Sequence, residues 1–411
     1  MTKNESKGRE ISLQRAEKLK SYRKIELGIP KGTDESSITS YQKQKAKLKE
    51  MFGAGEEQWK DWKWQVEHRI DKVEDLAKVI ELSDKEKEEM EECAGTYRFA
   101  ITPYYLALID PVNPLDPIRA MCTPSIHELE GSGEADPMAE EFTNPAGVVT
   151  RRYPDRLIIN VTNVCAMYCR HCQRRRRIGG TDCGASREEI DESLEYVRNS
   201  PEVREVLVTG GDALLLEDDQ LEYILSSLRE MPHIEVIRFG SRVPVTLPMR
   251  ITDNLIDIIK KYHPIFLNTH FNHPIELTPE AIEACSKLAN AGVPLGNQMV
   301  LLKGVNDDKY IVQLLNQELL KARVRPYYIF LAKNVVGTTH FGTSIDKGLE
   351  IMEYLRGRLT GMGIPTFAVN APNGLGKIPL LPEYVVEKTL QKVVLRTWEG
   401  ELVEYPNGEE G

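Results

Sequence analysis

From Arg156 onward the chain alternates between short apolar runs and longer amphipathic segments, and this alternation constrains the fold more than any other feature. Six apolar runs are followed by a seventh, and they lie at residues 157–161, 206–209, 236–239, 265–269, 295–302, 326–331 and 367–370. Segments with helical spacing separate them, at residues 186–198, 219–230, 253–262, 279–291 and 308–321. Strands that alternate with helices form parallel sheets through βαβ units. We therefore predict an α/β fold with a partial (β/α)6 barrel over residues 156–335.

The flanking regions have different compositions. Residues 1–110 are rich in Lys, Glu and Gln with apolar residues at helical spacing, so we expect an N-terminal helical region. Residues 111–155 carry many Pro, Gly and acidic residues, which predicts an irregular connection. Residues 336–411 form a C-terminal region, and we predict no recognisable fold for the polar tail after its apolar run.

The composition indicates a soluble enzyme. The 411 residues are 41% hydrophobic, which supports a full core. The first 31 residues lack the apolar segment of a secretory signal, and no run approaches the ~20 residues that span a bilayer, so we expect a cytoplasmic protein without a membrane partner. Seven cysteines, an odd number, suit a reducing compartment. The net charge of −10 disfavours nucleic acid as a partner.

Three cysteines, Cys165, Cys169 and Cys172, lie in the sequence Cys-Ala-Met-Tyr-Cys-Arg-His-Cys directly after the first apolar run. Three thiolates within eight residues can hold three irons of a four-iron cluster and leave the fourth iron open. A zinc finger would need a fourth ligand nearby, and Cys183 has no Cys or His partner in a second short pair. We interpret the remaining cysteines as ordinary thiols: Cys93, Cys122, Cys183 and Cys285.

Polar clusters follow the apolar runs, at the strand ends where parallel barrels gather their chemistry. They comprise Gly210-Gly211-Asp212, Ser241 with Arg242, His270 to His273, Asn297 with Gln298, and Lys333. Two glycines allow close approach to a ligand, although a tight turn would use them too. His270, Asn297 and Gln298 are equally explained as core polar groups bonded to backbone. The arginine run 174–177 is a nucleic-acid signal elsewhere, but beside the cysteines its first member suits an amino-acid carboxylate.

The cysteine spacing resembles the cluster motif of radical S-adenosylmethionine enzymes, whose fold is a partial barrel. The resemblance implies that the open iron binds S-adenosylmethionine and that the reduced [4Fe-4S] cluster cleaves it to a 5'-deoxyadenosyl radical. It also implies a set of residues that contact this cofactor: His171, Gly210, Gly211, Asp212, Ser241, Arg242, His270 and Gln298.

A wider pattern closely resembles the lysine 2,3-aminomutase family. It consists of Tyr168-Cys-Arg-His-Cys-Gln-Arg-Arg-Arg, Thr209-Gly-Gly-Asp-Ala-Leu, Leu267-Asn-Thr-His-Phe-Asn-His-Pro, Val293-Pro-Leu-Gly-Asn-Gln, Arg325-Pro-Tyr-Tyr and Ala371-Pro-Asn-Gly-Leu-Gly-Lys377. The resemblance implies pyridoxal phosphate bound as an imine to Lys377, with Arg152, Tyr153 and Arg156 at its phosphate site. It further implies that Arg174 binds the substrate α-carboxylate while the amino group migrates between neighbouring carbons. A flavodoxin or ferredoxin as reductant and a dimeric or tetrameric homo-oligomer are also expected.

Two positions depart from the lysine-specific members, which hold the substrate ammonium with two aspartates. Lys333 and Asn370 stand there instead. Two like charges at 4 Å repel by about 4 kcal/mol at an effective dielectric near 20, so a lysine side chain would be repelled and a carboxylate held. We therefore predict conversion of L-glutamate to 3-aminoglutarate, with aspartate as the close competitor. A solvated surface role for Lys333 is the alternative to this assignment.

A zinc site of the lysine enzymes is not expected here. The chain lacks the C-terminal cysteines of that site, and Asp308 takes the position of the cysteine supplied by a neighbouring subunit. Three other functions stay open: action on lysine, free or in a translation factor; an iron–sulfur redox or sensor protein without turnover; and an RNA-modifying radical enzyme that uses the arginine run.

Overall fold

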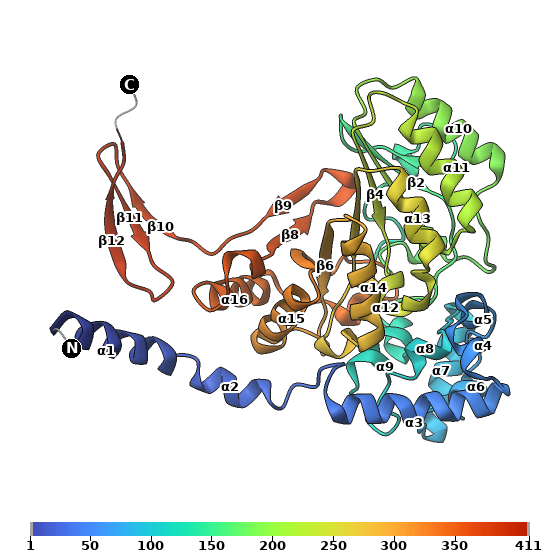
Figure 1. Cartoon of the computed structure of the whole chain (residues 1–411), viewed down its shortest axis with the longest axis horizontal. Helices are drawn as coiled ribbons and strands as arrows, with labels where there is room; N and C mark the ends of the chain where they lie inside the picture. Colours follow the sequence, from blue (N-terminus) through green and yellow to red (C-terminus); the bar gives the residue numbers. More distant parts are fainter. Residues whose placement is uncertain (1–2, 409–411) are drawn as a thin grey trace.

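The core of the protein is one open nine-stranded sheet. The computed structural model describes residues 3–408 (Figure 1). The sheet has the order of the sequence, with strands β1 (Val149–Thr150), β2 (Arg156–Asn160), β3 (Glu205–Thr209), β4 (Val236–Gly240), β5 (Ile265–Thr269), β6 (Leu295–Leu301), β7 (Arg325–Leu331), β8 (Thr366–Asn370) and β9 (Lys377–Pro379). Strands β2 to β8 are parallel, and β1 and β9 add antiparallel edges. The predicted partial barrel is confirmed, with each apolar run forming a strand.

Helices cover the outer face of the sheet because each presents one apolar stripe to it. They are α10 (Arg187–Arg198), α11 (Asp218–Arg229), α12 (Val243–Thr246), α13 (Asp253–Lys261), α14 (Pro279–Asn290), α15 (Lys309–Lys321) and α16 (Ile345–Leu355). In α10 the stripe is Ile190, Leu194 and Val197, all buried. Side-chain caps begin several of these helices, as Ser186 does for α10 by accepting from the backbone N–H of Glu189.

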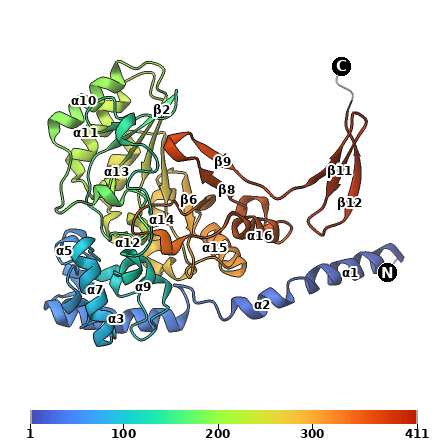
Figure 2. The same cartoon turned by 180° about the vertical axis from the view of Figure 1, so that it is seen from behind.

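The N-terminal region is helical. It contains α1 (Lys3–Glu17), α2 (Lys20–Glu26), α3 (Glu35–Phe52), α4 (Glu56–Lys60), α5 (Trp62–Glu67), α6 (Val73–Leu76), α7 (Asp84–Thr96) and α8 (Pro103–Leu106). The following segment, residues 111–155, is not wholly irregular, because it contains the short helix α9 (Pro117–Cys122) and the edge strand β1. Helices α1 and α2 form an arm that leads away from the barrel, while α3 to α9 gather at its base (Figures 1 and 2). No helix in the described part of the chain is long and apolar enough to cross a membrane.

The absence of a fold in the C-terminal tail was a wrong prediction. The tail forms a three-stranded antiparallel sheet of β10 (Val385–Lys388), β11 (Lys392–Arg396) and β12 (Leu402–Pro406). All residues of β10 and β12 are exposed, and the sheet projects from the barrel on the same side as the arm of α1 and α2 (Figure 2). Strands without a buried face need no alternation of apolar and polar residues, so this segment shows no period that predicts a sheet.

Candidate active site

One cavity of about 330 Å³ opens at the carboxyl ends of the parallel strands. It collects predicted site residues from segments that are far apart in the chain. Those that line it are Arg152, Cys165, Cys169, His171, Cys172, Arg174, Gly210, Gly211, Asp212, Ser241, Arg242, His270, Gln298, Lys333, Asn370 and Lys377. Tyr153 and Arg156 are not among the lining residues; Tyr153 lies beside Lys377, and Arg156 lies against the Tyr153 ring. Parallel strands converge at this edge, which explains why residues far apart in sequence meet here.

The three cysteines sit in the loop after β2. Burial raises the pKa of Cys172 to about 11 and also raises that of Cys165, so both thiols are protonated until a metal supplies compensating charge. In residues 3–408 no three His, Cys, Asp or Glu side chains converge as ligands of a single metal ion. In a four-iron cluster each cysteine thiolate binds a different iron, which three cysteines in one loop can supply.

The arginine run anchors this loop in two opposite directions. Arg175 points toward Glu128, which also accepts hydrogen bonds from Arg170 at 2.8 and 2.6 Å. All three of these side chains are buried. Arg174 and Arg176 point the other way, toward Glu140. Because three of the four arginines in the run are engaged in ion pairs, the run is not an exposed phosphate-binding patch, which argues against the RNA-modifying alternative.

The glycine pair after β3 approaches the chain itself. A Cβ atom on Gly210 would lie 2.3 Å from the backbone oxygen of Thr162, and one on Gly211 would lie 2.4 Å from that of Val164. Gly210 also has a φ of +143°, which side-chain-bearing residues rarely adopt. The pair therefore fixes the start of the cysteine loop against β3 while it lines the cavity.

Asp212 connects the ends of β3 and β4. Its carboxylate accepts hydrogen bonds from Ser241 Oγ at 2.7 Å, from the backbone N–H of Arg242 at 2.7 Å and from that of Val243 at 3.1 Å. Burial raises its pKa to about 6 against these bonds. Because its acceptors are largely engaged within the chain, Asp212 holds Ser241 and Arg242 in position beside the cavity.

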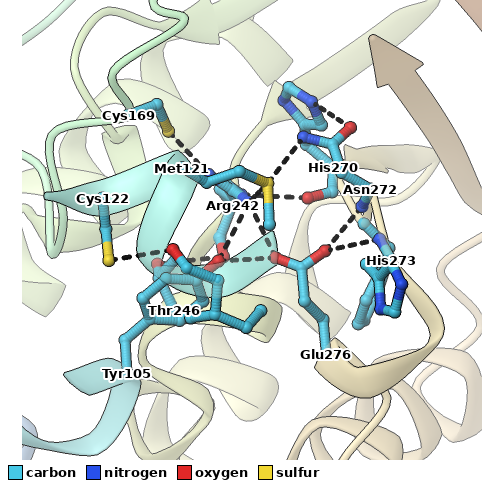
Figure 3. A network of polar contacts seen from close by, with 12 residues as sticks. Tyr105, Met121, Cys122, Cys169, Arg242, Thr246, His270, Asn272, His273 and Glu276 are labelled. Carbon is cyan, nitrogen blue, oxygen red and sulfur yellow. Dashed lines mark hydrogen bonds and ion pairs between the residues drawn. The ribbon is translucent and has the colours of Figure 1, made fainter. Parts of the chain in front are cut away.

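Arg242 is the centre of a buried polar network (Figure 3). Its Nη1 lies 2.7 Å from Cys169 Sγ, its Nη2 lies 2.7 Å from Glu276 Oε1, and its Nε donates to the backbone oxygen of His270 at 3.0 Å. Glu276 is fully buried and also accepts from Tyr105 Oη at 2.7 Å. Sequence reasoning missed Glu276, although it lies six residues after His270, in the cluster that follows β5.

The structure assigns different positions to His270, Asn297 and Gln298, the three residues that could equally be polar groups of the core. Asn297 points away from the cavity, and its amide exchanges two hydrogen bonds with the backbone of Phe271, at 2.7 and 3.0 Å. Gln298 and His270 line the cavity. Burial lowers the pKa of His270 to about 3, so its imidazole is neutral, and Nε2 lies 2.9 Å from Asn272 Oδ1. Asn297 is thus a structural residue, and the other two remain available to a ligand.

Lys377 begins β9 and pairs in register with Asn370 on β8. Burial lowers its pKa, and Arg152 and Arg156 lower it further, against the effect of Tyr153. The Tyr153 ring lies between two cations, with Lys377 Nζ 5.4 Å and Arg156 Cζ 4.0 Å from its centroid. A lowered pKa increases the neutral fraction of a lysine, and the neutral amine is the form that acts as a nucleophile toward a carbonyl.

Two buried guanidinium nitrogens in the cavity lining have no hydrogen-bond partner in the described structure. They are Arg152 Nη1 and Arg238 Nε. Both residues line the cavity, and buried donors without acceptors are rare in folded proteins. Nη2 of Arg238 already pairs with Glu205, and the two donors without partners, Nη1 of Arg152 and Nε of Arg238, suit an anionic group such as the phosphate of pyridoxal phosphate. Arg238, in the middle of β4, was missed because a single arginine in a strand carries no motif.

Lys333 follows β7 and lines the cavity, so the surface-lysine alternative does not fit the structure. Its ammonium donates a hydrogen bond to Gln173 Oε1, a residue that sequence reasoning did not single out. Burial, together with the charges of Arg174 and Arg152, lowers the pKa of Lys333 to about 7. The lysine thus lies in a strongly cationic environment that favours an anionic ligand.

Asp308, at the expected zinc position, caps α15. Its Oδ1 accepts from the backbone N–H groups of Tyr310 and Ile311, at 2.8 and 3.2 Å. The carboxylate thus has a structural task of its own.

Comparison with known proteins identifies the family. A sequence model described as the radical SAM superfamily matches residues 159–315, and one described as lysine-2,3-aminomutase matches residues 352–411. Glutamate 2,3-aminomutase from Clostridioides difficile strain 630 is 56% identical over 398 residues, which cover 96% of this chain and 94% of that protein. L-lysine 2,3-aminomutase from Acetoanaerobium sticklandii is 51% identical over 362 residues, covering 87% of each chain.

Among solved structures, that of Streptococcus suis SuiB bound to S-adenosylmethionine matches 53% of this chain and 51% of its own, with a TM-score of 0.41 and 15% identity. Membership of the radical SAM superfamily implies a [4Fe-4S] cluster and S-adenosylmethionine. The near full-length relatives are aminomutases, which are isomerases. This chain therefore belongs to the lysine 2,3-aminomutase family of radical S-adenosylmethionine enzymes.

Proposed function

We propose that the protein is a pyridoxal phosphate-dependent glutamate 2,3-aminomutase, which moves the amino group of L-glutamate from the α-carbon to the β-carbon and yields 3-aminoglutarate. The observation that carries the proposal is the cationic lining of the cavity around Lys333. Arg152, Arg174, Arg177, Arg238 and Lys377 line the same cavity, in a chain whose net charge is −10. A substrate with two carboxylates compensates these charges, whereas a lysine side chain would add to them.

The two carboxylates have separate partners. Arg174 is oriented by Glu140 through Nε and Nη2, at 3.0 to 3.1 Å, which leaves Nη1 for the substrate α-carboxylate. Lys333 pairs with the γ-carboxylate, and Asn370 donates an amide hydrogen bond to it. Aspartate is one methylene shorter, so its two carboxylates could reach both Arg174 and Lys333 only after a rearrangement.

The cofactors divide the chemistry. When bound, S-adenosylmethionine and the cluster supply the radical that removes hydrogen from the substrate β-carbon, and pyridoxal phosphate carries the amino group between the two carbons. The protein holds the cluster with Cys165, Cys169 and Cys172. Lys377 binds pyridoxal phosphate covalently, and Arg152, Arg156 and Tyr153 support its phosphate site, to which Arg238 adds a free donor. The residues predicted to contact S-adenosylmethionine line the same cavity.

Two partner assignments complete the proposal. The cluster needs a one-electron reductant, for which we propose a flavodoxin or ferredoxin, and we propose a homo-oligomer as the assembled enzyme. The large exposed apolar residues of the projecting C-terminal sheet, among them Val385, Leu402 and Tyr405, support the second assignment because such residues are commonly covered by a second copy.

The first test offers substrates separately. Cluster-reconstituted protein is incubated without oxygen with pyridoxal phosphate, S-adenosylmethionine and dithionite, together with glutamate, aspartate or lysine, and products are followed by NMR. We expect 3-aminoglutarate from glutamate alone. Production of β-lysine would keep the reaction and overturn the substrate assignment. Absence of both product and 5'-deoxyadenosine would instead favour the redox or sensor alternative.

The second test reverses the charge. The double variant Lys333→Asp with Asn370→Asp is expected to lose glutamate turnover by about a thousandfold, because a repulsion of about 4 kcal/mol replaces an attraction. Lys85→Asp, an exposed change on α7, serves as the control and should turn over glutamate like the unmodified protein. Undiminished glutamate turnover in the double variant would overturn the assignment of Lys333 and Asn370.

A further inference from the structure

Glu140, the buried carboxylate that orients Arg174, also lies near a second arginine of the cavity lining. It lies in the connection before β1 with only 2% of its surface exposed. Arg174 donates to both carboxylate oxygens from Nε, at 3.1 and 3.0 Å, and its Nη2 lies 3.0 Å from Oε1. Arg152 Nη2 lies 3.7 Å from Oε1, and Arg176 Nη2 lies 3.6 Å from Oε2. A single carboxylate thus lies among three guanidinium groups.

Two of these guanidinium groups belong to different parts of the cavity. Arg174 comes from the cysteine loop and faces the proposed seat of the substrate carboxylate. Arg152 follows β1 and faces the proposed phosphate site beside Lys377. Each guanidinium repels the other, and burial together with Arg174 lowers the pKa of Arg152. A carboxylate between them opposes this repulsion and fixes their separation.

We propose that Glu140 is a positioning residue for two anion-binding positions, called anion seats below: the substrate α-carboxylate position at Arg174 and the phosphate position at Arg152. Glu140 holds the substrate-binding face of Arg174 and the phosphate-binding face of Arg152 at a fixed distance and orientation. The substrate half of this inference rests on the function proposed above for Arg174. The phosphate half rests on the geometry around Arg152 and on its unpartnered Nη1.

The fork of Arg174 explains why orientation matters. A guanidinium that is held through Nε and Nη2 can present only its Nη1 side to a ligand, so the direction of approach of a carboxylate is set before it binds. The Glu140 carboxylate remains charged at neutral pH, because the arginines overcome the opposing effect of burial and lower the pKa of Glu140 to about 2. Glu140 is also a group that raises the pKa of Lys333, against Arg174, Arg152 and Lys377.

The chain contains a matched control for this residue. Glu128 is equally buried, at 1% exposure, and pairs with Arg170 and Arg175 from the same loop. Neither Glu128 nor its two arginines line the cavity. Loss of the charge at Glu128 removes a buried ion-pair partner without disturbing either proposed anion seat.

The experiment compares Glu140→Gln, Glu140→Asp and Glu128→Gln in the full-length protein. Pyridoxal phosphate binding to the cluster-free protein is measured by equilibrium dialysis, and glutamate KM and kcat are measured after reconstitution. Loss of one partner of a buried ion pair costs about 2–5 kcal/mol. We therefore expect Glu140→Gln to raise both the dissociation constant of pyridoxal phosphate and the KM for glutamate by about thirtyfold or more. Glu140→Asp should recover part of each loss, since it keeps the charge at a shorter reach.

Glu128→Gln is expected to lower thermal stability while pyridoxal phosphate binding and glutamate KM stay within about twofold, since no anion seat is disturbed. Equal losses in Glu128→Gln and Glu140→Gln would overturn the inference, because both effects would then reflect general stability. Unchanged binding and KM in Glu140→Gln would overturn it too. Should Glu140→Gln fail to fold, Glu140→Asp decides alone, since an unchanged KM there contradicts a positional role.

Failure of the proposed function is recognised separately. Should the unmodified protein act on an amino acid other than glutamate, the same comparison is made with that amino acid, because every candidate carries an α-carboxylate for Arg174. A protein that binds no pyridoxal phosphate at all would overturn the proposed function before any variant is compared.

Discussion

Arg242 Nη1 donates a hydrogen bond of 2.7 Å to Sγ of Cys169, a predicted cluster ligand. The same guanidinium contacts Glu276 through Nη2, so a buried cation joins the cysteine loop to the segment after β5. Burial opposes the charge on Arg242, but Cys169, Tyr105 and Glu276 together raise its pKa well above the ordinary arginine value. The position of the cysteine loop therefore depends on an ion pair inside the core.

The first prediction concerns the contribution of the Arg242–Glu276 ion pair to the free energy of unfolding. Arg242→Gln leaves the carboxylate of Glu276, which has no exposed surface, without its counterion, so the free energy of unfolding should fall by about 3–5 kcal/mol. Urea denaturation of the cluster-free protein measures it. Arg204 and Glu235 form a similar pair at the surface, with side chains 62% and 54% exposed, and Arg204→Gln should cost less than about 1 kcal/mol. Equal costs for the two variants would contradict the prediction.

A second prediction concerns the glycine pair and the cluster. The added methyl group of Gly211→Ala would meet the backbone of Asn163 and Val164, at 2.4 to 2.7 Å, and must displace the start of the cysteine loop. Iron and sulfide bound per chain after reconstitution should fall severalfold. Gly180→Ala lies after the arginine run with no atom within 4 Å of the new Cβ, and its iron content should match that of the unmodified protein. A normal cluster content in Gly211→Ala would show that the loop accommodates the methyl group.

The barrel was predictable because its signals are local. Each parallel strand is a short apolar run, and amphipathic helices separate the runs, so the ends of the observed strands differ from those of the predicted runs by at most one residue. The meeting of the polar clusters in one cavity follows from the same topology. The ligands that these residues bind remain predictions.

The contacts that orient the site were not predictable, because their partners are distant in sequence. Glu140 lies 34 residues before Arg174, and Glu276 lies 34 residues after Arg242. An isolated glutamate in a connection or a short helix has no spacing that distinguishes it from a surface residue. The glycine pair shows a different limit: its close approach was expected toward a ligand, but the nearest atoms belong to the cysteine loop.

A third prediction isolates the covalent role of Lys377. Lys377→Arg keeps a positive charge at the start of β9 but removes the primary amine, so borohydride reduction should fix no pyridoxal phosphate at this site. Mass spectrometry of peptides measures the modification. Lys392→Arg on the exposed C-terminal sheet is the matched control and should leave labelling of Lys377 complete. Labelling at another lysine in the unmodified protein would overturn the assignment.

The last prediction concerns the pH dependence of glutamate binding, which follows from the pKa of about 7 for Lys333. Below pH 7 the free enzyme carries the ammonium that pairs with the γ-carboxylate. Above pH 7 the lysine is mostly neutral, and binding must take up one proton. Glutamate KM should therefore rise by about tenfold per pH unit between pH 7 and 8.5, while it changes little between pH 6 and 7. Lys333→Arg provides the control, because a guanidinium stays charged throughout this range and its KM should be independent of pH. A KM that rises equally in both proteins would assign the titration to another group.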